Sequence, residues 1–201
     1  MKKYFVQAIM NKEIDESLLQ KVSKELPRDI AIFYSSQYVE LANQIKSQLG
    51  KNIHAFAQTL GCSRPKLNPK IKAILLVSDG EFHAISLAYK SNLHVFVLNT
   101  NKLTKISEEQ IKKFSQKKKS SQVNFLSAKK VGVIISTKPG QQRLKQALTK
   151  KLKDKEVYYF LSNNININEF ENFPHIQAWI NTACPRMDLN SNKIINIGDL
   201  D

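Results

Sequence analysis

The stretch that decides the fold is residues 29–50, which read DIAIFYSSQYVELANQIKSQLG. The apolar residues from Asp29 to Tyr34 are typical of a buried strand. The residues from Gln37 to Leu49 predict an amphipathic helix, which Gly50 ends. Its apolar face consists of Val39, Leu41, Ala42, Ile45 and Leu49. The stretch therefore predicts one strand–helix unit.

The same alternation of apolar runs and amphipathic stretches recurs along the chain, which is the pattern of α/β proteins with parallel sheets. We expect two similar lobes, each a small parallel sheet flanked by helices, at residues 1–126 and 127–201. In the first lobe we expect a helix at Ser17–Glu25 and, besides Asp29–Tyr34, strands at Tyr4–Ile9, Ile53–Ala57, Ala73–Ser78 and Leu93–Leu98. In the second we expect strands at Val131–Ser136, Val157–Leu161 and Gln177–Asn181, a helix at Gln141–Leu152 and an irregular tail from Asp188 onward.

The 201 residues carry 31 Lys and Arg against 17 Asp and Glu, a formal charge of +14. A field of this sign attracts nucleic acid or an RNA-associated partner. A compositional bias toward Lys over the whole chain explains the same charge without a binding role, and both interpretations stay open. No apolar run approaches the roughly 20 residues that cross a bilayer, and no signal-type core follows Lys2 and Lys3, so we expect a cytoplasmic protein without membrane contact.

The most specific motif is Asn181-Thr182-Ala183-Cys184-Pro185-Arg186, a cysteine directly after an apolar predicted strand. Ligands collect at the carboxyl ends of parallel strands. Arg186 either raises the thiolate character of Cys184 or holds a carboxylate through its planar fork. The alternative is an inert cysteine at a strand end.

The other cysteine, Cys62, lies in Gln58-Thr59-Leu60-Gly61-Cys62-Ser63-Arg64-Pro65, again a Gly- and Pro-containing turn beyond a predicted strand. A reducing cytosol disfavours a disulfide between Cys62 and Cys184, so we interpret both as free or metal-bound thiolates.

Two further turns lead from a predicted strand into a predicted helix. In Ser78-Asp79-Gly80-Glu81-Phe82-His83 the start of the helix is suited to an anionic group, and His83 is a candidate donor to a substrate carboxylate or else a capping or surface residue. The stretch Ser136-Thr137-Lys138-Pro139-Gly140-Gln141 is suited to a nucleoside or carboxylate, but it lacks the glycine spacing of a Walker A loop.

In this combination and order the four stretches resemble the diphthamide synthase family, in its archaeal type and the related eukaryotic subunits. Leu60-Gly61-Cys62 matches the family's Leu-Gly-Cys turn, and residues 79–83 match its Asp-Gly-x-Phe-His. Cys184-Pro185-Arg186 matches its Cys-Pro-Arg signature, and residues 137–141 match its third-domain turn. The resemblance extends from about Tyr4 to about Asp188.

The resemblance implies an assembly of three similar α/β domains, each of which gives one cysteine to a 4Fe-4S cluster. Residues 1–126 correspond to the family's second domain and residues 127–201 to its third, so Cys62 and Cys184 are the expected metal ligands. The family's first domain is absent. We expect a separately encoded chain to supply it, in a homo- or hetero-oligomer.

The activity that the resemblance implies is that of a radical-type 3-amino-3-carboxypropyl transferase. The cluster and S-adenosylmethionine generate a 3-amino-3-carboxypropyl radical, which adds to a histidine of translation elongation factor 2 in the first step of diphthamide biosynthesis. His83, Gln141 and Arg186 are the candidates for holding the aminocarboxypropyl group. Elongation factor 2 is the expected protein substrate, and nucleic acid is not required.

Two alternatives stay open. Quinolinate synthase also combines three α/β domains with a three-cysteine cluster, but the Asp-Gly-x-Phe-His and Cys-Pro-Arg stretches argue against it. A non-catalytic accessory subunit, or a basic RNA- or ribosome-associated binding module, is the non-enzymatic alternative. The pair of cysteines discriminates between the enzyme and the non-catalytic module, because a scaffold that holds no cluster has no need of both.

Overall fold

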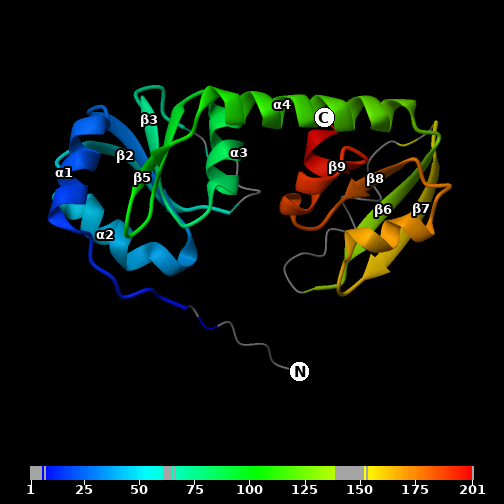
Figure 1. Ribbon diagram of the computed structural model, residues 1–201, viewed down its shortest axis with the longest axis horizontal. Helices are drawn as coiled ribbons and strands as arrows, with labels where there is room; N and C mark the ends of the chain where they lie inside the picture. The colour runs from blue at the N-terminus through cyan, green and yellow to red at the C-terminus, as the bar shows by residue number, and fades with distance from the viewer. Residues whose placement is uncertain are drawn as a thin grey trace. The chain divides into compact units, whose positions relative to one another are not determined.

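The chain is described by a computed structural model that covers residues 6, 8–60, 65, 67–138, 152 and 154–200. It divides into two compact units, residues 1–114 and 115–201. The division falls inside the helix α4 (Glu108–Ser127), whose 20 residues run on through the polar stretch that follows the first sheet (Figure 1). The assignment of residues 1–126 and 127–201 to particular domains of a larger assembly stays a prediction.

The first unit is built on a sheet whose described strands lie in the order β2-β1-β3-β4-β5. Neighbours from β2 to β4 pair in parallel, as the sequence predicts, whereas the short edge strand β5 runs antiparallel to β4. The bounds in this unit are α1 Glu16–Glu25, β1 Asp29–Tyr34, η1 Ser36–Tyr38, α2 Val39–Gln48, β2 Asn52–Gln58, β3 Ala73–Val77, α3 Glu81–Ser91, β4 His94–Leu98 and β5 Leu103–Lys105.

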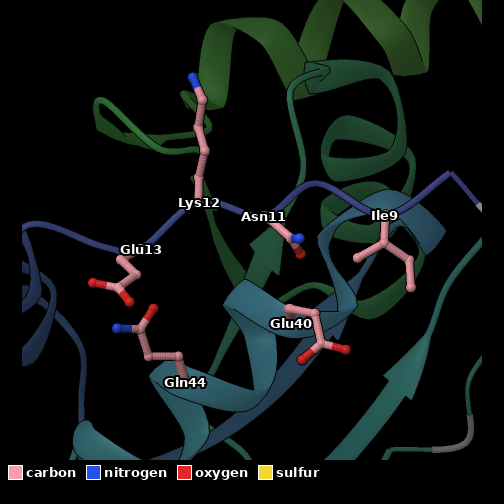
Figure 2. A pocket seen from close by; sticks show the side chains of 6 residues that line it. All are labelled: Ile9, Asn11, Lys12, Glu13, Glu40 and Gln44. Carbon is pink, nitrogen blue, oxygen red and sulfur yellow. The ribbon is translucent and has the colours of Figure 1, made fainter.

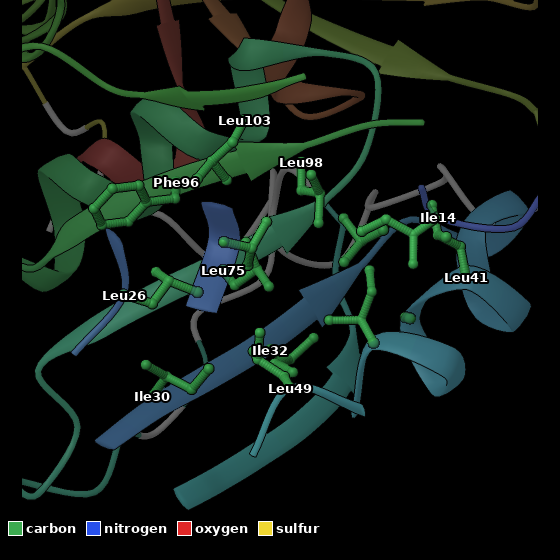
Figure 3. Close-up of a cluster of buried hydrophobic side chains, with 14 of the residues drawn as sticks. Ile14, Leu26, Ile30, Ile32, Leu41, Leu49, Leu75, Phe96, Leu98 and Leu103 are labelled. Atoms are coloured by element: carbon green, nitrogen blue, oxygen red, sulfur yellow. The ribbon is translucent and has the colours of Figure 1, made fainter. Parts of the chain in front are cut away.

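Both faces of this sheet are covered by helices. Side chains of a strand alternate between the two faces, so a single strand contributes to the buried clusters on both. Ile30 and Ile32 of β1 pack with residues of α1 and α2. Figure 3 shows Ile30 and Ile32 in this cluster with Leu41 of α2. Ala31 and Phe33 of the same strand pack with residues of α3. The parallel strands therefore lie between two helical layers, and their carboxyl ends share one edge of the sheet.

The second unit has a sheet with the described strand order β7-β6-β8-β9, in which every neighbouring pair is parallel. Its elements are β6 Lys130–Ser136, β7 Glu156–Ser162, η2 Ile167–Asn172, β8 Ala178–Asn181, η3 Pro185–Asn190, β9 Ile194–Asn196 and η4 Ile197–Asp199. The three strands predicted for this region are confirmed, each within one residue at either end.

The prediction of an irregular tail from Asp188 onward is wrong. Ile194–Asn196 forms β9, which pairs with β8 from Trp179 to Asn181. A strand of three residues is too short to show a period in the sequence, so it is recognisable only through its partner strand.

Two further predictions meet the limits of the described residues. The strand expected at Tyr4–Ile9 falls largely outside them, and residues 6, 8 and 9, which are described, are not in a strand. The helix expected at Gln141–Leu152 lies outside them except for Leu152, which is not helical. No helix in the described part of the chain has the length and apolar character needed to span a membrane.

One face of the second sheet is closed by aromatic side chains. Phe170 of η2 stacks on Trp179 of β8 at 4.2 Å between ring centroids, and Phe160 of β7 lies 4.7 Å from the same indole. Gly132 of β6 makes room for this ring, because a Cβ atom at residue 132 would lie 2.5 Å from two atoms of Trp179. The glycine is therefore required by a close approach of side chain to strand.

Some of the lysines have structural roles. The Nζ of Lys155 donates to the carbonyls of Phe125, Leu126 and Ala128, at the carboxyl end of α4, where a cation is favoured by the helix dipole. Lys118 pairs with Asp199 at 2.5 Å. Part of the high positive charge therefore stabilises the fold.

Candidate functional site

The turn that carries Cys184 joins the carboxyl end of β8 to η3. Asn181, the last residue of β8, is 1% exposed and directs its side chain back over this turn. Its Nδ2 donates to the Cys184 carbonyl at 2.8 Å and to Asn196 Oδ1 of the neighbouring strand at 2.7 Å. Its Oδ1 accepts from the backbone N–H of Ala183 at 2.9 Å. One buried amide thus fixes the backbone on both sides of the bend.

Thr182 anchors the same turn to the middle of the sheet. Its hydroxyl and its backbone N–H both donate to the carbonyl of Ile134 in β6, at 2.7 and 3.2 Å. Beyond the bend, the N–H of Met187 donates to the Cys184 carbonyl at 3.1 Å. The backbone is held from three directions while the Cys184 side chain is exposed and not in a disulfide. This arrangement presents an accessible thiol on a rigid support, which is what a metal ligand requires.

The sequence also predicts Arg186 and Gln141 near this edge. Arg186 is exposed in η3, two residues after Cys184. Gln141 lies outside the described residues. The strand that leads toward it, β6, is the direct parallel neighbour of β8, and the turn after β6 begins with Lys138 N–H donating to Ser136 Oγ at 3.2 Å. The chain therefore leaves β6 at the same edge of the sheet as Cys184.

In the first unit, Cys62 lies outside the described residues, but the strand that precedes it is well defined. After β2, the N–H of Thr59 donates to the Tyr34 carbonyl at 2.9 Å, and Thr59 is buried. Leu60, the next residue, is 59% exposed. The chain therefore leaves the carboxyl edge of the sheet two residues before Cys62.

The turn between β3 and α3 lies at the same edge and leads into the first turn of α3, which carries His83. Ser78 is buried, and its Oγ accepts from the N–H of Gly80 at 3.4 Å. The helix begins at Glu81, and no side chain caps it. His83 is half-buried in the first helical turn, with its ring 5.4 Å from that of Phe82. The structure thus places His83 in the first turn of a helix that follows the carboxyl end of β3, and its role as a donor stays a prediction.

Sequence reasoning missed the turn between β1 and α2, Ser35–Tyr38. In the sheet, β1 lies between β2 and β3, so this turn lies between the segment that leads to Cys62 and the turn that carries His83. Gln37 Nε2 donates to Asp79 Oδ2 at 3.5 Å. Burial, with the Asp79 carboxylate second, raises the pKa of Tyr38 to about 12, so its hydroxyl keeps its proton. The sequence shows that residues 35–37 are polar, but only the strand order shows where they lie.

A polar cavity of about 630 Å³ lies beside this turn, between the segment from Ile9 to Glu13 and the helix α2 (Figure 2). The segment is tied to η1 at one point and to α2 at another. The N–H of Met10 donates to the Gln37 carbonyl at 2.8 Å, and the N–H of Ile14 donates to Gln44 Oε1 at 3.2 Å. The segment before α1 therefore helps to fix the backbone of Gln37.

Within the described residues, no three His, Cys, Asp or Glu side chains converge to hold a metal ion. Cys184 is the one expected ligand that those residues include.

Fold and site together define an α/β protein in which turns at the carboxyl edges of parallel strands carry the candidate groups, with Cys184 presented on a rigid bend. Residues 2–193 match the family described as putative diphthamide synthesis protein. The chain belongs to this family, and the resemblance drawn from its four motifs is confirmed.

Individual relatives agree with this result. The 2-(3-amino-3-carboxypropyl)histidine synthase of Methanocaldococcus jannaschii is 31% identical over 194 residues, which cover 90% of this chain and 54% of that protein. The synthase of Pyrococcus horikoshii is 28% identical over 206 residues, covering 92% and 59%. The crystal structure of Dph2 from Pyrococcus horikoshii with a 4Fe-4S cluster superposes with a TM-score of 0.77 at 25% identity, over 92% of this chain and 59% of that one. The chain thus spans a little over half the length of its archaeal relatives.

Proposed function

We propose that this chain is part of a 4Fe-4S, S-adenosylmethionine-dependent 3-amino-3-carboxypropyl transferase that modifies a histidine of translation elongation factor 2. The observation that carries the proposal is the Cys184 turn, in which an exposed thiol stands on a backbone fixed by Asn181 and Thr182. Family membership and the similarity to a protein whose crystal structure contains a 4Fe-4S cluster support it.

In this proposal Cys184 and Cys62 are two of the three protein ligands of the cluster. A thiolate is the usual protein ligand of such a cluster, and three thiolates leave one iron for the substrate. When bound, the cluster would supply an electron and an open iron position for cleaving a carbon–sulfur bond of S-adenosylmethionine. The third thiolate is expected from the family's first domain.

The remaining site residues orient the cosubstrate. Arg186 binds its carboxylate, since a guanidinium matches the planar geometry of that group. We propose that His83 and Gln141 hold the rest of the aminocarboxypropyl group. These roles fit the position of His83 and Arg186 beside the carboxyl ends of β3 and β8.

The test is anaerobic co-expression with a first-domain chain, followed by iron–sulfur spectroscopy and measurement of methylthioadenosine release with elongation factor 2. Cys184→Ala and Cys62→Ala should each abolish the cluster absorption or the transfer. Ser191→Ala, in the segment between η3 and β9, is the matched control and should retain both. A complex that keeps its cluster and its turnover in either cysteine variant would contradict the proposal.

A non-catalytic binding module remains the competing function, and the same experiment separates the two. A wild-type complex that forms without binding iron would favour the module. The structural use of Lys155 and Lys118 weakens the argument from net charge, because these side chains bind carbonyls and a carboxylate of the same chain.

A further inference from the structure

The short strand β9 contains a buried polar side chain to which the proposed function gives no role. Asn196 is 7% exposed, and the residues on either side of it, Ile195 and Ile197, belong to the apolar core of the second unit. Because β9 pairs in parallel with β8, Asn196 is in register with Asn181. Two buried amides therefore meet across neighbouring strands at the carboxyl edge that carries Cys184.

The two amides hold successive backbone groups of the Cys184 turn. Asn181 accepts from the N–H of Ala183 at 2.9 Å and donates to the carbonyl of Cys184 at 2.8 Å. Asn196 Oδ1 accepts from Asn181 Nδ2 at 2.7 Å, and Asn196 Nδ2 donates to the Pro185 carbonyl at 3.5 Å. The strand β9 thus acts on the turn both through Asn181 and directly.

Stability alone does not account for this pair of amides. Burying an amide is costly unless its hydrogen bonds are made, and two apolar side chains in register would pack without that cost. A satisfied polar pair provides a single arrangement instead, because each hydrogen bond requires a particular orientation of both amides. In this turn the arrangement fixes the backbone from which the Cys184 thiol projects.

We propose that Asn196 is a positioning residue for Cys184, and that β9 is therefore part of the metal-binding site. The inference rests on the proposed function, in which Cys184 is a cluster ligand. Replacing a group that orients a metal ligand commonly lowers the affinity for the metal by about 10- to 100-fold. Asn196 lies beyond residue 193, where the match to the family ends, so neither that match nor the four motifs include it.

The test is retention of iron by the complete cluster-containing complex, challenged anaerobically with EDTA. Asn196→Ala should lose iron faster than the wild type by about tenfold or more, and the electron paramagnetic resonance spectrum of its reduced cluster should change. Asn192→Ala deletes an exposed amide just before β9 and should behave as the wild type.

A second variant at the same position guards against a failure to fold. Asn196→Thr is close to Asn in size and favours a strand, so it should keep the fold where Ala does not. Its hydroxyl lies too near the backbone to replace the amide, so this variant should also lose iron faster than the wild type.

A variant that is destabilised elsewhere in the same unit separates positioning from stability. Val131→Ala shortens a fully buried side chain at the amino end of β6, at the opposite edge of the sheet from Cys184. The stability of each variant is read from the urea midpoint of Trp179 fluorescence in the chain alone. At an equal loss of stability, Val131→Ala should lose iron at the wild-type rate.

The outcomes distinguish this inference from the function on which it rests. Iron loss at the wild-type rate in both Asn196 variants would overturn the role of Asn196 and leave the proposed function standing. Equally fast iron loss in Asn196→Ala and Val131→Ala would also overturn it, because instability of the unit would then be the cause. A wild-type complex that holds no cluster would overturn the proposed function and the inference together.

Discussion

Replacing Asn181 with Ala is expected to destabilise the second unit and to release the turn that holds Cys184. Asn181 is buried and makes three hydrogen bonds with Cys184, Asn196 and Ala183. The Cys184 carbonyl keeps a second donor, the N–H of Met187. The Ala183 N–H and the Asn196 Oδ1 lose the partner that Asn181 provides.

The size of the effect follows from those two groups. A buried polar group left unsatisfied costs about 1 to 3 kcal/mol, so two such groups cost about 2 to 6 kcal/mol. Water entering the space of the deleted amide offsets part of this cost, and we expect about 3 kcal/mol. With a urea m-value of about 1 to 3 kcal/mol per molar, the unfolding midpoint should fall by at least about 1 M.

The assay can follow this unit alone in the full chain. Trp179 is the single tryptophan of the sequence and lies buried in β8, so its fluorescence reports the unfolding of the second sheet. Asn124→Ala is the matched control, since it deletes the same amide where Nδ2 donates to the Asn192 carbonyl on the surface at 3.1 Å. That variant should change the stability by less than about 0.5 kcal/mol.

The reasoning is refuted if Asn181→Ala and Asn124→Ala have the same urea midpoint. In that case the buried amide would not be what fixes the bend at Cys184.

Three further predictions concern the fold around the sites. Gly132→Ala should lower the free energy of unfolding of the second unit by about 1 to 3 kcal/mol, and with it the melting temperature, because the new Cβ meets the Trp179 ring at 2.5 Å. An unchanged transition in tryptophan fluorescence would contradict this. Lys155→Met removes a cation from the carboxyl end of α4 and should cost about 1 kcal/mol, measured by the same fluorescence transition; an equal effect at high salt would argue against the charge as the cause. A hydrogen bond from His54 is the largest of the effects that lower the pKa of Asp29 below its ordinary value of 3.8. The stabilisation from this hydrogen bond is therefore present above pH 3.8 and is lost as the pH falls toward the lowered pKa of Asp29. As the pH is lowered through this range, the urea midpoint measured by circular dichroism should fall more in the wild type than in Asp29→Asn. Parallel curves of midpoint against pH would contradict a contribution of this carboxylate to stability.

Much of the fold could be predicted because its signals are local. The strand Asp29–Tyr34 has the predicted bounds, and the helices expected at Ser17–Glu25 and Gln37–Leu49 differ only at their ends. Apolar periodicity is strong in these segments, and Pro27 and Gly50 punctuate them. The edge strands β5 and β9 were missed because three residues are too few to show an apolar period. Such a strand is recognisable only by its pairing with a neighbouring strand.

In the candidate site, too, local signals could be predicted from the sequence and long-range contacts could not. The sequence marks Cys184, Arg186 and His83, since an apolar run followed by Pro or Gly places each at the end of a predicted strand or the start of a helix. It gives no sign that Asn181 reaches Asn196 or that Gln37 reaches Asp79, because residues 15 and 42 positions apart meet only through the order of the strands.

By itself the sequence determined the α/β class, the family and the cysteine-bearing strand ends, because these depend on short motifs and on a period that neighbouring residues repeat. The tertiary structure alone decided the supports of those motifs, namely the buried amide behind Cys184 and the hydrogen bond from Gln37 to Asp79. Strand order places these groups beside one another, and strand order is set by the packing of whole helical layers on the sheet rather than by any one stretch of chain.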